Sequence, residues 1–224
     1  MRSVVGLFDS GSGGLNTVRY LEEAGDVDLV YLIDRENAPY GIKTKKELIG
    51  IAERNIARLL DMGAERVLIA CCTASTVYKY LGKEYREKAI PIIEAVANAA
   101  KNSTRSHRIG VIATKRTVES HAFARALKGY KAYELALSEL VGMIDSGLSD
   151  KTITKEDEVR LEEMLMPILR RNVDTIILGC THFPSLKETV RKIASNHGVT
   201  SIIDSALIGA ELLTEASRKL NLNQ

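Results

Sequence analysis

The chain has 224 residues, of which 45% are hydrophobic and 27% charged, a composition typical of a soluble globular protein with a substantial core. Lysine and arginine number 31 against 29 aspartate and glutamate residues, and the net charge of +2 argues against a nucleic-acid binder with a basic surface. The longest uncharged run, Thr175–Leu186, is too short to span a bilayer, and Asp9 interrupts the only apolar stretch near the amino terminus. We therefore expect a cytoplasmic protein with no membrane or nucleic-acid partner.

Short β-branched segments alternate with longer amphipathic segments along the chain. Apolar runs bounded by charged residues or glycine are typical of strands that are buried on both faces of a parallel sheet. The expected strands are Ser3–Phe8, Val27–Ile33, Arg66–Ala70, Pro91–Ile93, Arg108–Ile112, Lys131–Leu135, Val173–Leu178 and Ser201–Ile203. Between them, the capping box Thr44-Lys-Lys-Glu47 predicts a helix that ends near Gly63, and an apolar stripe from Leu161 to Leu169 predicts another.

Three segments of the first half have counterparts in the second half, in the same order and at a nearly constant spacing. Val5–Ser10 resembles Ile109–Thr114, Val67–Cys71 resembles Ile176–Cys180, and Ile92–Ala95 resembles Ile202–Ser205. Chance similarity between buried strands explains one such match more easily than three. We expect an α/β fold of two pseudo-symmetric parallel-sheet domains with the active site in the cleft between them. The expected domains are residues 1–96 with a C-terminal helix over 207–224, and residues 97–206.

A cysteine lies at an equivalent strand end in each half of the chain. In open parallel α/β sheets, ligands bind beyond the carboxyl ends of the strands. If the halves face each other, Cys71 and Cys180 point into one cleft from opposite sides. Stereochemical inversion needs this arrangement, because one thiolate removes a proton from a carbon and the other thiol protonates the planar carbanion from behind. Thiols suit both steps, since their reference pKa of about 8.5 lies close to neutrality.

The glycine-rich turn Asp9-Ser-Gly-Ser-Gly-Gly14 follows an expected strand and precedes an expected helix. Its spacing matches neither the dinucleotide-binding fingerprint nor a Walker A loop. The N–H groups at the start of a helix favour an anion, and a carboxylate fits this turn better than a phosphate. A tight strand–helix connection that binds no ligand explains the same glycines.

Four motifs along the chain are Phe8-Asp-Ser-Gly-Ser-Gly-Gly-Leu15, Ala38-Pro-Tyr-Gly41, Ala70-Cys-Cys-Thr-Ala-Ser75 and Gly179-Cys-Thr-His-Phe-Pro184. Together they resemble the signature sequences of the glutamate racemases, within the aspartate/glutamate racemase superfamily. The resemblance implies an isomerase that interconverts L- and D-glutamate without pyridoxal phosphate or a metal. It also implies that the product, D-glutamate, is used to build bacterial peptidoglycan.

The resemblance assigns roles residue by residue. Cys71 and Cys180 match the two catalytic cysteines, the first acting on the D-enantiomer and the second on the L-enantiomer. Asp9 matches the carboxylate that assists the first cysteine, and His182 matches the imidazole that assists the second. Positions that match substrate contacts are Ser10, Tyr40, Gly41, Cys72, Thr73, Thr114, Thr117 and Thr181. The partner implied is thus a small amino acid, and the sequence is compatible with a homodimer.

The chain departs from the family pattern at several positions. Cys72 replaces an asparagine whose amide contacts substrate, and a thiol is a weak donor that cannot replace that amide. Asp145, a further candidate site residue, aligns with a family glutamate that is one methylene longer. Leu137-Ser138 replaces a Cys-Pro pair, and the chain is shorter than typical members. These changes leave open a racemase of another amino acid, such as aspartate, or a non-catalytic amino-acid-binding protein.

A zinc protein is a further alternative. Cys71, Cys72, Cys180 and His182 are zinc ligands by residue type, but the usual Cys-x₂-Cys knuckle is missing from their spacing. Two other acidic residues near strand ends, Glu94 and Asp204, are expected to face solvent or to cap helices.

Overall fold

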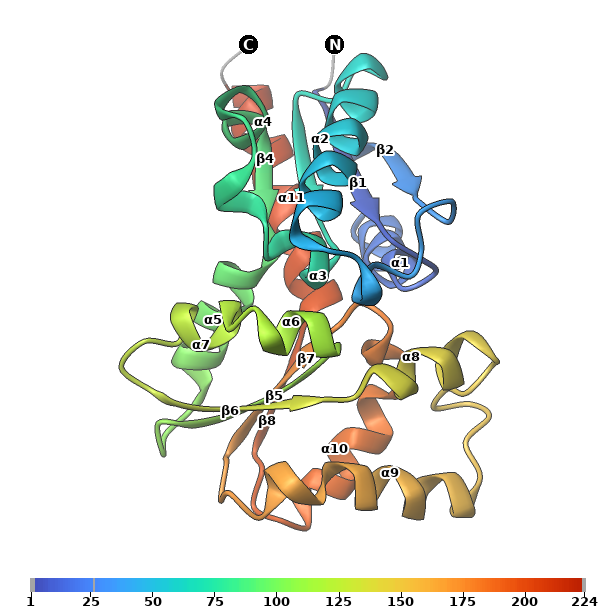
Figure 1. Ribbon diagram of the computed structural model, residues 1–224, viewed down its shortest axis with the longest axis vertical. Helices are drawn as coiled ribbons and strands as arrows, with labels where there is room; N and C mark the ends of the chain where they lie inside the picture. Colours follow the sequence, from blue (N-terminus) through green and yellow to red (C-terminus); the bar gives the residue numbers. More distant parts are fainter. Residues whose placement is uncertain (1–2, 26, 223–224) are drawn as a thin grey trace. The chain divides into compact units, whose positions relative to one another are not determined.

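The computed structural model describes residues 3–25 and 27–222, and the chain forms two compact units (Figure 1). One unit contains Met1–Ile92 and Ala206–Gln224, and the other contains Ile93–Ser205. The first unit is thus assembled from two separate stretches of the chain, whereas the second is continuous in sequence.

The first unit is a parallel sheet flanked by helices. Its strands are β1 (Val4–Asp9), β2 (Asp28–Ile33), β3 (Arg66–Ile69) and β4 (Ala89–Pro91). They form a four-stranded sheet in the order β2-β1-β3-β4, and every pairing is parallel. Its helices are α1 (Gly14–Ala24), α2 (Lys45–Asp61), α3 (Cys72–Ser75), α4 (Lys83–Lys88) and α11 (Ser205–Leu222), with short 3₁₀ turns η1 (Tyr40–Ile42) and η2 (Tyr78–Tyr80).

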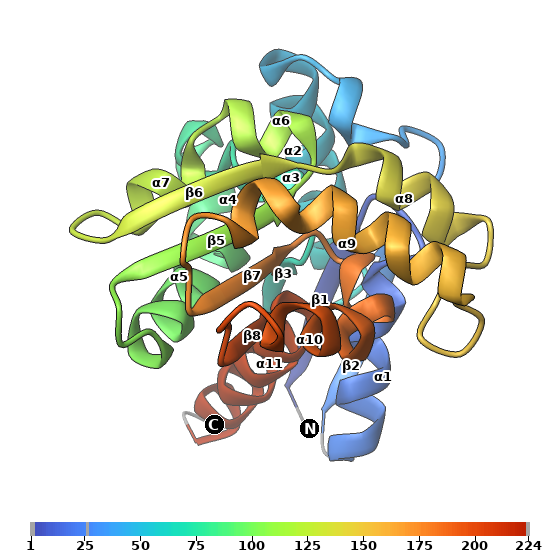
Figure 2. The ribbon, with the colours of Figure 1, turned by 90° about the horizontal axis from the view of Figure 1, so that it is seen from below.

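The second unit has the same architecture. Its strands are β5 (Arg108–Ala113), β6 (Lys131–Ala136), β7 (Thr175–Gly179) and β8 (Ser201–Asp204). They form a parallel sheet in the order β6-β5-β7-β8, which can be followed in Figure 2. Its helices are α5 (Ile92–Ser103), α6 (Lys115–Glu119), α7 (Ala122–Ala126), α8 (Ser138–Asp145), α9 (Lys155–Leu169) and α10 (Lys187–Ser195), with the 3₁₀ turn η3 (Phe183–Leu186).

The two sheets share one topology, because β5 to β8 take the places in the second sheet that β1 to β4 take in the first. Each of the eight expected strands is present within a residue or two of its expected position. The expected α/β fold of two similar parallel-sheet halves is therefore confirmed.

The expected helix signals are also confirmed. Thr44 caps α2, and its side chain and that of Glu47 form the reciprocal hydrogen bonds of a capping box. Gly63 follows this helix with a φ of 95°, in the left-handed region that favours glycine. The apolar stripe of α9 packs into the core of the second unit. None of the helices in the described part of the chain is long and apolar enough to cross a membrane.

One expected strand is displaced. The sequence predicts a strand over Pro91–Ile93, but β4 ends at Pro91 and Ile92 begins α5. Ile92, Val96 and Ala100 are fully buried, which is the spacing of one helical face. A short apolar run does not distinguish the end of a strand from the buried first turn of a helix, and this explains the error.

Candidate active site

Cys71, the first candidate catalytic residue, lies at the carboxyl end of the first sheet. It follows β3 and directly precedes α3, and its side chain is buried. The Cys71 Sγ lies 3.4 Å from Oγ of Ser10, which follows the neighbouring strand β1. The sheet therefore brings together two predicted site residues that are 61 positions apart in the sequence.

The environment of Cys71 keeps its thiol protonated. Burial raises the pKa of the Cys71 thiol to about 11, and the negative charge of Asp9 acts in the same direction. Hydrogen bonds from Ser10 and from the backbone N–H groups of Ala74 and Thr73 favour the thiolate but do not offset these effects. At neutral pH the thiol of the free protein is therefore ready to donate a proton, and it needs a nearby positive charge before it can accept one.

The glycine-rich turn donates a hydrogen bond to the side chain of Asp9 and packs against it. Asp9 is the last residue of β1 and is fully buried, and its Oδ1 accepts a hydrogen bond from the backbone N–H of Gly11 at 3.0 Å. A Cβ on Gly14 would lie 2.5 Å from the Cβ of Asp9, so α1 approaches this side chain closely. The turn thus binds a carboxylate of the protein itself, that of Asp9, and the ligand carboxylate expected from the sequence stays a prediction.

Tyr40 points into the first unit. Its ring is buried, and its hydroxyl donates to Oδ2 of Asp34 at 2.6 Å. Asn55 of α2 donates from Nδ2 both to Asp34 Oδ2 at 2.9 Å and to the Tyr40 hydroxyl oxygen at 3.0 Å. Gly41 follows, and a Cβ there would meet nothing within 4 Å. The open space beside the turn therefore adjoins Gly41 rather than the Tyr40 hydroxyl.

Sequence reasoning missed the roles of Asp34 and Asn55. Asp34 follows β2, a position where a polar residue faces the ligand edge of a parallel sheet. Asn55 lies within the buried stripe of α2, between Ala52 and Ile56. A polar residue in an apolar helical stripe needs a buried partner, and this signal was present in the sequence.

Cys180, the second candidate catalytic residue, lies at the carboxyl end of the second sheet. It follows β7 and is buried, and its Sγ lies 3.7 Å from Nδ1 of His182. On the other side of the imidazole, Nε2 lies 3.2 Å from Oδ1 of Asp145, the last residue of α8. This contact is close enough for an ion pair, but its angles are not those of a hydrogen bond. The three residues form a thiol–imidazole–carboxylate series.

Thr114 and Thr117, two of the predicted substrate-binding threonines of the second unit, lie together. Thr114 follows β5 and caps α6, accepting a hydrogen bond from the Thr117 N–H at 3.3 Å. The two hydroxyl oxygens are 2.9 Å apart. Ser138, part of the pair that replaces the family Cys-Pro, accepts a hydrogen bond from the N–H of Lys115 at 2.8 Å. The Ser138 hydroxyl thus helps to hold the segment that carries both threonines.

The remaining predicted site residues flank the two thiols. Cys72 and Thr73 begin α3, Thr181 lies between Cys180 and His182, and all three are buried. Across residues 3–25 and 27–222, no group of three or more His, Cys, Asp or Glu side chains is arranged to hold a metal ion.

The two thiols occupy equivalent positions but have different neighbours. Cys71 follows β3, which pairs with β1, and Cys180 follows β7, which pairs with β5 in the matching register. The last residue of β1 is Asp9, whereas the last residue of β5 is Ala113. The second unit supplies His182 and Asp145 in place of the strand-end carboxylate. The repeat therefore preserves the thiol while changing the polar groups beside it.

A family model described as Asp/Glu/Hydantoin racemase matches residues 16–213. The chain belongs to this family. It is 35% identical over 217 residues to a glutamate racemase from Neisseria meningitidis serogroup A, an alignment that covers 92% of this chain and 77% of that protein. The racemase family predicted from the four motifs is therefore confirmed.

Solved racemase structures have the same fold. A glutamate racemase isoform, RacE1, from Bacillus anthracis superimposes with a TM-score of 0.85 at 27% identity, covering 97% of this chain and 82% of that one. A glutamate racemase from Francisella tularensis, solved in complex with D-glutamate, superimposes with a TM-score of 0.84 at 29% identity and covers 99% of this chain and 82% of that one. This agreement confirms the two-domain α/β architecture of the racemase family for this chain.

Proposed function

We propose that the protein is a glutamate racemase that uses Cys71 and Cys180 as its two acid–base groups. The observation that carries the proposal is the placement of a buried thiol at the same strand end of each unit, beside a different tuning group. The names of the relatives, and the D-glutamate bound to the Francisella tularensis enzyme, support glutamate as the substrate.

The proposed reaction is a proton exchange at the α-carbon. In one direction the Cys71 thiolate takes the α-proton of D-glutamate, and the electron pair of the C–H bond passes to the carbanion. Cys180 then delivers its proton to the opposite face, which forms L-glutamate. In the other direction the roles reverse, and no bond changes other than the C–H and S–H bonds.

The tuning groups match these roles. Because burial and Asp9 raise the pKa of the Cys71 thiol to about 11, the α-ammonium group of a bound amino acid is needed to stabilise the thiolate. We assign Asp9 to proton transfer with Cys71. His182, 3.7 Å from the Cys180 sulfur, is assigned to Cys180, with Asp145 orienting the imidazole.

The proposed substrate contacts follow the family positions. Ser10 and the turn at Gly41 lie on the Cys71 side, and Tyr40 contributes through its backbone because its hydroxyl is bonded to Asp34. Cys72, Thr73, Thr114, Thr117 and Thr181 complete the proposed set.

The two units are proposed to be the two racemase domains, divided near residue 97 and again near residue 206. The protein is further proposed to act in the cytoplasm, to form a homodimer, and to supply D-glutamate for peptidoglycan without pyridoxal phosphate or a metal.

The test is exchange of the α-proton, followed by NMR in D₂O with each enantiomer of glutamate, aspartate and neutral amino acids. Exchange that produces the opposite enantiomer of glutamate supports the proposal, and turnover of aspartate alone would reassign the substrate. Cys71→Ser and Cys180→Ser are each expected to lower racemisation by roughly a hundredfold or more. Full activity in either variant rules out the two-thiol reaction, and no exchange by the folded, reduced protein indicates a binding protein.

A further inference from the structure

A buried polar cluster lies beside the turn that contains Tyr40. The carboxylate of Asp34 accepts hydrogen bonds from the Tyr40 hydroxyl at 2.6 Å and from the amide of Asn55 at 2.9 Å. The amide of Asn37 lies within 2.9 Å of Oδ1 and 3.0 Å of Oδ2 of the same carboxylate. Asp34, Tyr40 and Asn55 are each no more than 5% exposed. Buried polar groups are retained only when their hydrogen bonds are made, and in this cluster Tyr40, Asn55 and Asn37 all donate to Asp34.

The protons of the cluster have a single consistent arrangement. Although burial opposes ionisation of Asp34, the hydrogen bonds from Tyr40, Asn55 and Asn37 lower its pKa. Burial and the bond to Asp34 raise the pKa of Tyr40, so the phenol stays neutral and donates. Its oxygen in turn accepts from Asn55. The Tyr40 hydroxyl therefore donates its proton to a carboxylate of the protein itself, that of Asp34.

The cluster is connected to the Cys71 side of the site at two points. The backbone N–H of Asp34 donates to the carbonyl of Asp9 at 2.9 Å, which continues the pairing of β2 with β1. Tyr40 begins η1, which contacts α3, and its ring lies in the same apolar cluster as Cys71 and Ala74. Asp34 thus joins the end of β1 to the turn that packs against the thiol-bearing segment.

We propose that Asp34 is a positioning residue that acts through the Tyr40 hydroxyl to hold the Tyr40–Gly41 turn against the Cys71 segment. The proposal rests on the proposed racemase function, in which Cys71 exchanges the α-proton. It differs from a role for Tyr40 as a substrate ligand, because it assigns the hydroxyl to the fold and leaves the backbone at Gly41 to face the open space.

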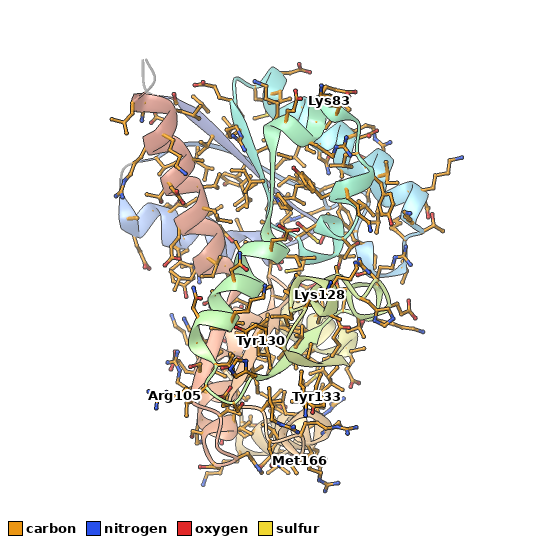
Figure 3. All side chains as sticks on the ribbon, turned by 90° about the vertical axis from the view of Figure 1, so that its left-hand side faces the viewer. Lys83, Arg105, Lys128, Tyr130, Tyr133 and Met166 are labelled. Carbon is orange, nitrogen blue, oxygen red and sulfur yellow. The ribbon has the colours of Figure 1, made fainter. Side chains whose placement is uncertain are left out.

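Two variants separate these roles. Tyr40→Phe keeps the ring and removes the hydroxyl. Asp34→Asn keeps the shape but removes the charge and replaces one of the two accepting oxygens with an NH₂ donor, so the side chain can no longer accept from Tyr40, Asn55 and Asn37 together. A matched control is Thr104→Val, because Thr104 also donates a hydroxyl proton to a carboxylate, that of Asp174, at 2.5 Å. Asp174 directly precedes β7, so it lies at the end of this strand opposite Cys180. Its carboxylate also accepts a hydrogen bond from the backbone N–H of Arg105, a residue labelled in Figure 3.

The kinetic test uses glutamate with the full-length variants. A misplaced turn reduces productive alignment, so both Tyr40→Phe and Asp34→Asn should lower kcat by roughly tenfold or more with KM changed by less than about twofold. Because both act on one contact, the double variant should be no slower than the slower single variant. Thr104→Val should keep the kinetic constants of the original protein. A raised KM with unchanged kcat in Tyr40→Phe, or multiplied effects in the double variant, overturns the proposal.

A second measurement does not depend on turnover. The rate of iodoacetamide alkylation, read separately at Cys71 and Cys180 by peptide mass spectrometry, reports access to each thiol. Loosening the turn should speed alkylation at Cys71 by about threefold or more in both variants, while Cys180 serves as the internal reference. Unchanged alkylation at Cys71 contradicts the proposal. If the original protein racemises no amino acid, the proposed function fails, and the alkylation rates still decide whether Asp34 holds the turn.

Discussion

Gly14 packs directly on the side chain of Asp9. A Cβ added to Gly14 would lie 2.5 Å from the Cβ of Asp9, closer than packed carbon atoms approach one another, and 3.2 Å from its Cγ. The start of α1 therefore fixes where the Asp9 carboxylate lies relative to Cys71. The last glycine of the motif is required by this contact and not by a left-handed backbone, since it is not among the positive-φ residues.

Gly14→Ala is expected to displace Asp9. Overpacking should lower the free energy of unfolding by about 1–3 kcal/mol. The shifted carboxylate should lower kcat for glutamate by roughly tenfold or more. Gly50→Ala is the control, because a Cβ there meets only the flexible end of Arg54, and in helix α2 it should add about 0.5–1 kcal/mol of stability. Equal kinetics for the two variants would show that Asp9 tolerates the displacement.

The pH dependence of Cys71 alkylation should reveal its raised pKa. With a pKa of about 11, the thiolate fraction of Cys71 keeps rising with pH in a range where an ordinary thiol is already ionised. Asp9→Asn removes the second of the two causes, so the alkylation profile should shift to lower pH while burial keeps it above that of a free thiol. A plateau near pH 8.5 in the unmodified protein would contradict this environment.

The same shift has a consequence for stability. The folded state holds the Cys71 proton to a higher pH than the unfolded chain, so the unfolded state loses its proton first as the pH rises. The contribution of this thiol to the free energy of unfolding is therefore present below about pH 8.5 and declines as the pH approaches about 11. Denaturant unfolding across this range should show a smaller decline for Cys71→Ser.

His182→Asn should slow proton transfer at Cys180, since it removes the imidazole that lies 3.7 Å from the sulfur. We expect kcat to fall by roughly a hundredfold, and Asp145→Asn to have a smaller effect because its side chain is half exposed. The deuterium isotope effect on kcat/KM should grow more for α-deuterated L-glutamate than for the D-enantiomer. His197→Asn is the control, because it breaks a comparable histidine–carboxylate pair, with Glu162 at 3.0 Å. An unchanged kcat in His182→Asn would remove the imidazole from the reaction.

Cys72→Asn should strengthen glutamate binding. An amide supplies two donors and an acceptor where the thiol supplies one weak donor, and such a bond to a charged substrate group is expected to lower KM by about tenfold. Cys72→Ser, which adds a stronger donor without the reach of an amide, should have a smaller effect. KM measured for glutamate and aspartate checks the prediction. A gain for aspartate alone would indicate that Cys72 belongs to a pocket for the shorter substrate.

The inner strands were predictable from the sequence because buried parallel strands are continuous apolar runs, whereas the edge strands β2 and β6 are half-exposed and do not show the expected burial on both faces. Every residue of β7 is buried, and only Val4 of β1 is not. The capping box at Thr44 was predictable for a similar reason, since both of its hydrogen bonds join residues three positions apart. The start of α5 was not predictable from the sequence, because its first residues are as apolar as the end of a strand.

The side-chain partners of the site were less predictable. Asp204 was expected to face solvent or to cap a helix; it does not face solvent, because it is 3% exposed and forms an ion pair with Lys187 at 3.1 Å. Asp34 and Asn55 meet across 21 positions of sequence, and the pair of Asp145 with His182 depends on where α8 ends. Motifs identify which residue types are present at a strand end, whereas packing of distant segments decides which of them touch.

Because the end of the chain returns to the first unit, it affects the order in which the two units can fold during synthesis. Helix α11 packs on the first sheet, where a Cβ on Gly209 would lie 3.1 Å from a methyl group of Leu68 and 3.3 Å from one of Thr17. Ser3, just before β1, donates its N–H to Asn221 near the other end of that helix at 2.8 Å. On the ribosome, all of Ile93–Ser205 emerges before this helix does, so the second unit can fold while the first still exposes an apolar face. The first unit, whose synthesis begins first, is therefore the unit that completes its folding last.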